Sequence, residues 1–411
     1  MSDTKEYCRF CGNELKHTFV DLGTQPLSNS YIPVKDADMG QMTYPLKVMV
    51  CDKCFLVQLK EFESPKGIFS DYAYFSSYSS SWLEHAKRYV EFMTQNYGVN
   101  ENSQVIEIAS NDGYLLQYFR EKNIPVLGIE PAKNVAKVAT EKGIPTISEF
   151  FGESLAKTLV AEGKKANLLI GNNVFAHVPN INDFTEGLNI ILADDGVLTL
   201  EFPHLLNLIE QNQFDTIYHE HFSYISLITA KKILEAHGLK IFDAQELHTH
   251  GGSLRLFICH NDGNFSVTPN VDEILNREIK AGMNKIESYL KFSEKVRKIK
   301  YDLLDCLIKL KREGKSIVGY GAAAKGNTLL NYCGVGVEFL DYVADKSPHK
   351  QNTLLPGSRI PVYSPKKILE TKPDYILILP WNIKDEITTE IKEKCDFQLR
   401  FITPIPKVCV I

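Results

Sequence analysis

Short apolar runs alternate with amphipathic segments from about residue 103 to residue 260. The apolar runs predict strands, which in the first half of this region are 104–108, 126–130, 168–171 and 197–200. The amphipathic segments between them predict helices, one of which follows Pro131 and ends at Gly143. Strands that alternate with helices build a parallel sheet covered on both faces. Two later runs, 239–242 and 253–259, are expected to complete this sheet.

The same alternation begins again after a long polar segment. Residues 272–311 are rich in Lys, Glu and Leu and predict helical structure that connects two domains. Strands are then expected at 316–321, 339–345 and 375–379, with a Gly/Ala-rich turn after the first. The fold class is therefore α/β, with two Rossmann-like domains and no clear sequence repeat between them. Because the first sixty residues lack helical periodicity and hold two cysteine pairs, we expect domain boundaries near residues 70 and 270.

Composition narrows the class of protein. A chain of 411 residues suits two or three domains. The 46 basic residues against 51 acidic ones give a net charge of −5, which argues mildly against a nucleic-acid partner. No apolar run reaches the roughly 20 residues that cross a bilayer, and the first residues lack the apolar core of a signal peptide. We expect a cytoplasmic protein.

Four of the nine cysteines form two C-x2-C pairs, Cys8 with Cys11 and Cys51 with Cys54. Two such pairs separated by a loop place four thiolates around one Zn²⁺ ion. Four thiolates fill the coordination sphere and leave no position for water, so the predicted zinc is structural. The alternative is four unligated thiols. The five scattered cysteines are expected to serve packing.

A candidate cofactor turn, Glu107 to Gly113, follows the first strand of the sheet and precedes a helix. Gly113 and the small Ala109 allow the backbone to pass close to a ligand. Glu130 ends the second strand, where an acid can accept hydrogen bonds from both ribose hydroxyls of an adenosine group. Because the turn lacks the G-x-G-x-x-G pattern, it favours S-adenosylmethionine over NAD. NAD and a ligand-free turn are the alternatives.

Polar residues also follow the strand 168–171. The carboxyl ends of strands in such a sheet face the ligand crevice, which places Asn173 and His177 where a methyl donor and its acceptor would meet. The alternative is an asparagine that caps a helix and a hydrogen-bonded surface histidine.

The richest cluster of ionisable groups lies after the strand 197–200, in Tyr218-His219-Glu220-His221. Three interpretations compete: acid–base catalysis, a His-x-His metal site, and a solvated surface loop. A metal site would need a third ligand that the sequence does not supply. A base for a carbon acid needs a pKa near the operating pH, which suits histidine. An extended segment would point Tyr218 and Glu220 away from His221, so joint action requires an irregular loop.

The motifs together resemble a known family. In chain order they are the two cysteine pairs, 72–77, 107–113, Tyr218-x-Glu220-His221, 250–255 and 319–326. This ordered set is similar to the bacterial sugar C-methyltransferases that act on thymidine-diphosphate-linked 4-keto-deoxyhexoses. The resemblance covers essentially the whole chain. It implies a zinc-binding domain at 1–70, an S-adenosylmethionine-dependent methyltransferase domain at 71–270 and a nucleotide-sugar-contacting α/β domain at 271–411.

The resemblance also implies roles for single residues. His221 removes the C3 proton of the sugar, supported by Glu220 and Tyr218. The residues expected to contact the sugar or its nucleotide are Tyr72, Phe75, Asn173, His177, Lys325 and Asp345. The residues expected to contact the cofactor are Glu107, Ala109, Asn111, Gly113, Glu130 and Asn172. The zinc takes no part in bond making, and a monomer is expected.

Three other functions stay open from sequence alone. An RNA methyltransferase can also carry a zinc ribbon, although this chain lacks runs of Arg and Lys. A non-catalytic protein could keep the fold and bind nucleotide-sugars. A third possibility is the same enzyme acting on a guanosine- or cytidine-linked sugar.

Overall fold

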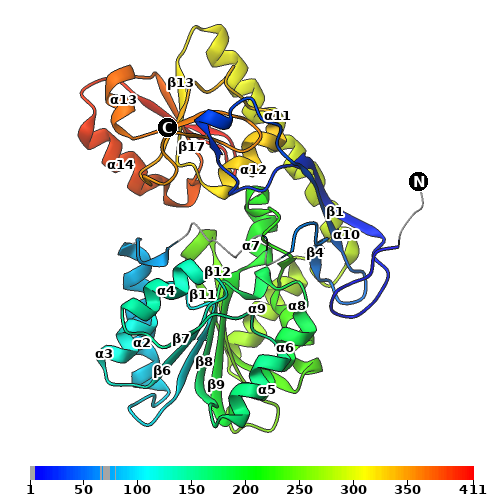
Figure 1. The fold of residues 1–411 in the computed structure, drawn as a ribbon. Helices are drawn as coiled ribbons and strands as arrows, with labels where there is room; N and C mark the ends of the chain where they lie inside the picture. Colours follow the sequence, from blue (N-terminus) through cyan, green and yellow to red (C-terminus); the bar gives the residue numbers. More distant parts are fainter. Residues whose placement is uncertain (1–4, 65–66, 68–74, 79) are drawn as a thin grey trace. The chain divides into compact units, whose positions relative to one another are not determined.

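The computed structural model describes residues 5–64, 67, 75–78 and 80–411. The chain divides into two compact units, both built from separate segments (Figure 1). Unit 1 comprises Met1–Lys16, Val50–Leu205 and Phe222–Ile286, and unit 2 comprises His17–Met49, Leu206–His221 and Glu287–Ile411. The unit boundaries therefore fall at different places from the three-part division expected from sequence, which remains a prediction. In the described part of the chain, no helix is long and apolar enough to cross a membrane.

A seven-stranded sheet forms the centre of unit 1, in the order β7-β6-β5-β8-β9-β12-β11. Its parallel strands are β5 (Val105–Ile108), β6 (Val126–Ile129), β7 (Thr146–Ile147), β8 (Ala166–Asn172) and β9 (Leu192–Pro203). The last two strands of this sheet along the chain are β11 (Leu239–Leu247) and β12 (Ser253–His260). They run antiparallel to each other, and β12 also runs antiparallel to β9. The strands predicted for this region are confirmed.

Helices cover both faces of this sheet (Figure 1). Side chains of the strands alternate between two cores, so that Val105 packs on one face and Ile106 on the other. One face carries α2 (Ser80–Asn96), α3 (Leu116–Glu121) and α4 (Lys133–Glu141). The other face carries α5 (Glu153–Ala161), α6 (Ile181–Ile191), α8 (Leu227–Ala236) and α9 (Pro269–Lys280). The carboxyl ends of β5, β6, β8 and β9 thus lie along one edge.

Unit 2 holds an eight-stranded sheet in the order β19-β18-β17-β13-β14-β16-β15-β2. Its parallel centre consists of β13 (Ile317–Tyr320), β14 (Val343–Ala344), β16 (Pro361–Tyr363), β17 (Tyr375–Ile378) and β18 (Arg400–Thr403). The antiparallel edges are β19 (Cys409–Val410), β15 (Thr353–Leu354) and β2 (Ile32–Pro33). Its helices include α11 (Phe292–Arg312), α12 (Ala324–Cys333), α13 (Lys366–Thr371) and α14 (Lys384–Lys394). The second α/β domain expected from sequence is confirmed.

Three regions differ in detail from the elements expected from sequence. The helical region 272–311 is divided into α9, α10 (Ile286–Leu290) and α11, because Gly282, at φ +82°, ends α9. The expected strand 339–345 shortens to two residues in β14. The early chain, which shows no helical pattern, contains β1 (His17–Gln25), β3 (Tyr44–Val50) and β4 (Val57–Leu59), and β4 pairs with β10 (Ser223–Tyr224) within unit 1.

Candidate active site and zinc centre

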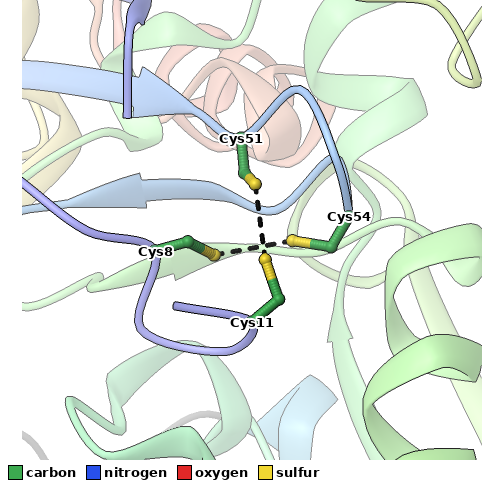
Figure 2. Close-up of side chains that lie close together, drawn as sticks. All are labelled: Cys8, Cys11, Cys51 and Cys54. Atoms are coloured by element: carbon green, nitrogen blue, oxygen red, sulfur yellow. Dashed lines mark hydrogen bonds between the residues drawn. The ribbon is translucent and has the colours of Figure 1, made fainter. Parts of the chain in front are cut away.

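The four paired cysteines converge on one point in unit 1 (Figure 2). Their sulfur atoms all lie within 4.8 Å of one another. The Sγ atoms of Cys8 and Cys54 are 3.5 Å apart, and those of Cys11 and Cys51 are 3.6 Å apart. A tetrahedron with Zn–S bonds of about 2.3 Å has sulfur–sulfur edges of about 3.8 Å. The sulfur geometry therefore fits one zinc ion with four thiolate ligands.

The cysteine cluster is fixed to the sheet of unit 1. Cys8, Cys51 and Cys54 belong to the same apolar core as α6 and α8. The Asn182 side chain of α6 donates to the backbone carbonyl of Phe10 at 2.9 Å, between the first two ligands. This position, closed by protein on its core side, agrees with a structural metal.

The candidate cofactor turn has an unusual backbone. Ala109, Asn111 and Gly113 have φ values of +56°, +50° and +75°, all in the left-handed region. A side chain at Gly113 would meet Ile144, because a Cβ there would lie 2.9 Å from its Cγ1. Left-handed backbone at non-glycine residues is strained and concentrates at ligand sites. The turn thus has left-handed backbone at three positions, as a glycine-rich ligand-binding turn often does. Alanine and asparagine occupy two of these positions here.

Glu130 holds this turn from the end of β6. One carboxylate oxygen accepts the backbone N–H of Asn111 at 3.0 Å, and the other accepts that of Ala132 at 2.8 Å. Burial raises the pKa of Glu130, and these two backbone donors limit the rise. The carboxylate is therefore held in one orientation at the carboxyl edge of the sheet, with lone pairs left for ligand hydroxyls.

Two buried side chains beside the turn carry oxygen atoms that have no hydrogen-bond partner among the described residues, although the Asn172 amide nitrogen lies 3.5 Å from the Tyr114 hydroxyl. Glu107 has no exposed surface, and neither of its carboxylate oxygens is satisfied. Burial raises its pKa well above the usual range, although the nearby Tyr114 hydroxyl limits the rise. The Oδ1 of Asn172, at the end of β8, is unsatisfied as well. Buried polar atoms without partners are rare, and oxygen atoms in such positions can accept hydrogen bonds from a ligand.

The other expected residues of unit 1 lie near the same edge. Asn173, at φ +53°, follows β8, and its backbone N–H donates to Glu201 of β9 at 2.7 Å. His177 is half-buried at the end of a short 3-10 helix, Phe175–His177. Phe75 is also half-buried, with its ring 5.6 Å from that of Tyr78. Tyr72 lies outside the described residues.

A tight turn in unit 2 brings Tyr218 and His221 together. The backbone N–H of His221 donates to the Tyr218 carbonyl at 3.0 Å, and the two ring centroids are 4.1 Å apart. The Nδ1–H of His221 donates to the backbone carbonyl of Thr216 at 2.8 Å. Because a carbonyl only accepts, this contact requires a proton on Nδ1 and leaves the lone pair of neutral histidine on Nε2. The irregular loop that joint action required is present.

Glu220 precedes His221 in this turn. It is buried, and its Oε1 accepts a hydrogen bond of 2.6 Å from the Asn29 side chain. Burial raises the pKa of Glu220 to about 7, and the Asn29 donor limits the rise. The hydrogen bond to Thr216, rather than one to Glu220, sets the tautomer of His221. With its raised pKa, the Glu220 carboxyl titrates near neutral pH.

Lys325 and Asp345 follow two neighbouring strands of the sheet in unit 2, β13 and β14. Lys325 lies in the first turn of α12, where burial lowers its pKa and Asp215 opposes that effect. Asp345 follows β14 and accepts the backbone N–H groups of Ala322 and Ser347, both at 2.7 Å. This repeats the arrangement of Glu130 in unit 1. A nucleotide could therefore contact the same kind of turn in unit 2.

Comparisons with known proteins identify the family. The chain is 35% identical over 404 residues to the C-methyltransferase NovU of Streptomyces niveus, covering 98% of this chain and 96% of that relative. Family models match a zinc binding domain at residues 8–69, a methyltransferase domain at 82–244 and a C-methyltransferase C-terminal domain at 248–406. The chain belongs to the C-methyltransferases.

Solved structures were compared as well. The magnesium protoporphyrin IX methyltransferase of Synechocystis PCC 6803 with bound SAM is 15% identical, with 44% of this chain and 79% of that chain covered and a TM-score of 0.34. A methyltransferase of Clostridium acetobutylicum ATCC 824 is 8% identical, with 43% and 92% covered and a TM-score of 0.35.

Family membership gives the chemistry of the two centres. This C-methyltransferase depends on S-adenosylmethionine and carries a zinc-binding domain with a four-cysteine cluster. The unsatisfied Glu107 and Asn172 fit the donors of the cofactor's amino-acid part, and the Glu130 carboxylate fits ribose hydroxyls. Sequence reasoning did not find Thr216 and Asn29, because one acts through its backbone and the other from a distant segment.

Proposed function

We propose that this C-methyltransferase methylates C3 of a nucleotide-linked 4-keto-deoxysugar, with His221 as the base. One observation carries the proposal: the Nδ1–H of His221 donates to the Thr216 carbonyl at 2.8 Å, which makes Nε2 the basic nitrogen. A carbonyl beside C3 acidifies the C3–H bond, and a base of near-neutral pKa suits its removal.

The reaction needs donors for the enolate oxygen that forms on the sugar. The phenol of Tyr218, packed against His221 with ring centroids 4.1 Å apart, is the proposed donor. Glu220, whose pKa is raised to about 7 by burial, can hold or release a proton beside this pair. S-adenosylmethionine supplies an electrophilic methyl group on its sulfonium. Once bound, the cofactor would give this methyl group to C3 and leave as S-adenosylhomocysteine, and Nε2 of His221 would keep the proton taken from C3.

The cofactor contacts are proposed for the turn after β5 and its neighbours. Glu130 accepts the ribose hydroxyls, and Glu107 and Asn172 accept donors of the amino-acid part. The left-handed backbone at Ala109, Asn111 and Gly113 supports close approach of the turn to the cofactor.

The proposed substrate contacts are those that the family resemblance implies. Lys325 and the first turn of α12 bind the diphosphate, since a cation and the N-terminal end of a helix favour an anion there. Asp345 contacts the nucleoside, and Tyr72, Phe75, Asn173 and His177 contact the sugar. The nucleotide is thymidine diphosphate, guanosine- or cytidine-linked sugars being the alternatives. The proposed enzyme is a cytoplasmic monomer.

The test is a product analysis with a matched set of substrates. The full-length protein is incubated with S-adenosylmethionine carrying a ¹³C-methyl group and with 4-keto-deoxysugars linked to dTDP, UDP, GDP or CDP. The proposal expects a new ¹³C methyl signal coupled to C3 of the dTDP-sugar. Methyl transfer to oxygen, or to a carbon other than C3, refutes it.

A further inference from the structure

A buried carboxylate lies beneath the turn that carries His221. Asp215, in the 3-10 helix Phe214–Thr216, has no exposed surface. The indole N–H of Trp381 donates to its Oδ2 at 2.7 Å. Trp381 follows β17, so this bond ties the turn to the centre of the sheet of unit 2. Asp215 is adjacent in sequence to Thr216, whose carbonyl accepts from His221.

Burial disfavours the charged form of Asp215, and the groups around its carboxylate favour it. Burial raises its pKa to about 6, while the Lys325 ammonium, the Trp381 indole and the backbone N–H groups of Asp215 and Thr216 limit the rise. The Lys325 ammonium itself lies 4.8 Å from the centre of the Trp381 ring. A buried carboxylate surrounded by donors fixes those donors in place, because each loses a partner if it turns away.

Helix α12 supports the same turn from a second side. The Thr328 hydroxyl donates to the backbone carbonyl of Ile217 at 2.9 Å, one residue after Thr216. The Asn327 side chain donates to the carbonyl of Ser28 at 2.7 Å, next to the Asn29 that contacts Glu220. The turn is thus held on both sides of Thr216, by Asp215 before it and by Thr328 after it.

We propose that Asp215 is a positioning residue for methyl transfer. It holds the Phe214–Thr216 turn so that the Thr216 carbonyl faces Nδ1 of His221 and keeps the base in the tautomer with a lone pair on Nε2. Asp215 touches neither substrate nor cofactor in this account. The inference rests on the proposed role of His221 as the base.

The carboxylate is needed because all its neighbours are donors. The Oδ2 of Asp215 accepts from Trp381, and its Oδ1 makes no hydrogen bond within the described residues. In Asp215→Asn the negative charge that attracts the Lys325 ammonium is lost, and an NH₂ group in the place of Oδ2 cannot accept from the indole. With this charge lost, the turn is held less firmly, and we expect the Thr216 carbonyl to move away from Nδ1 of His221. Trp381→Phe keeps the ring beneath Lys325 and removes only the indole donor, so it should produce a smaller effect in the same direction.

The experiment compares Asp215→Asn, Trp381→Phe and Thr328→Val with the wild type and with Asp305→Asn, an exposed acid on α11. Each full-length variant is checked for its melting temperature, kcat and KM for the dTDP-sugar. The ¹⁵N NMR spectrum of histidine-labelled protein reports the tautomer of His221, whose signals are assigned by their loss in His221→Gln.

The expected result is a fall in kcat of roughly 10- to 100-fold for Asp215→Asn, with KM within about threefold and a loss of the pure Nδ1–H tautomer. Trp381→Phe and Thr328→Val follow in part, and Asp305→Asn behaves as wild type. Folded variants with unchanged His221 signals and unchanged kcat overturn the inference. Full activity of His221→Gln would instead refute His221 as the base. The failure of the Asp215 inference and the failure of the proposed base therefore give different results.

Discussion

The carboxylate of Glu130 accepts the backbone N–H of Asn111 across a distance of 3.0 Å. This bond joins the end of β6 to the left-handed turn after β5, the two places that a bound adenosine would contact. If the proposed cofactor site is correct, changes at Glu130 should act on cofactor affinity.

Glu130→Gln should weaken the binding of S-adenosylmethionine. The glutamine NH₂ would face the N–H of Asn111 or Ala132, and one ribose acceptor would be lost. Hydrogen bonds to charged groups contribute about 1.5–3 kcal/mol, so Kd should rise roughly 10- to 150-fold. Isothermal titration calorimetry measures this, with Glu121→Gln, an exposed residue at the end of α3, as the control. Equal affinity of both variants would show that Glu130 does not contact the cofactor.

Ala109 should tolerate glycine but not a branched side chain. Its φ of +56° costs a non-glycine residue roughly 1–2 kcal/mol. Ala109→Gly relieves this strain but adds chain entropy to the unfolded state, so its net effect on stability should lie within about 1 kcal/mol. Ala109→Val should destabilise the protein and weaken cofactor binding. Urea unfolding and calorimetry of the two variants test this, and a neutral valine would contradict the backbone assignment.

Removal of the zinc should destabilise the fold, since the ion is structural and takes no part in methyl transfer. Cys11→Ser should lower the zinc content below about one ion per chain and reduce the unfolding free energy by a few kcal/mol. Cys306→Ser, on α11 and outside the cluster, is the matched control. Metal analysis and thermal unfolding give both quantities. Full zinc content in Cys11→Ser would remove this cysteine from the ligand set.

Glu220 should give stability a distinct pH dependence. Burial raises its pKa from 4.5 to about 7 in the folded protein, so the folded state binds the extra proton between these values. Stability should therefore fall as pH rises from about 5 to 8, by at most about 3 kcal/mol for a shift of 2.5 units. Glu220→Gln should lack this component, while the exposed Glu313→Gln should keep it. Urea unfolding at pH 5 and pH 8 compares them, and parallel curves for Glu220→Gln and wild type would refute it.

The sequence predicted the sheets better than the details of the site. Buried runs such as 104–108 and 168–171 are strands because both faces of a covered parallel sheet are apolar. Strand β1 was not predicted, because its buried and exposed positions follow no simple pattern. The motif residues Tyr218 and His221 could be selected by their chemistry. The contact of Asn29 with Glu220 joins residues 191 positions apart, and Thr216 acts through a carbonyl that every residue carries.

The most direct measurement is the exchange of the C3 proton of a dTDP-4-keto-deoxysugar with deuterated solvent, with adenosylhomocysteine present and S-adenosylmethionine omitted. The wild type and His349→Gln, an exposed histidine of unit 2, should exchange this proton rapidly, and His221→Gln should slow exchange by roughly 100- to 10,000-fold. Exchange at the wild-type rate in folded His221→Gln would contradict the account.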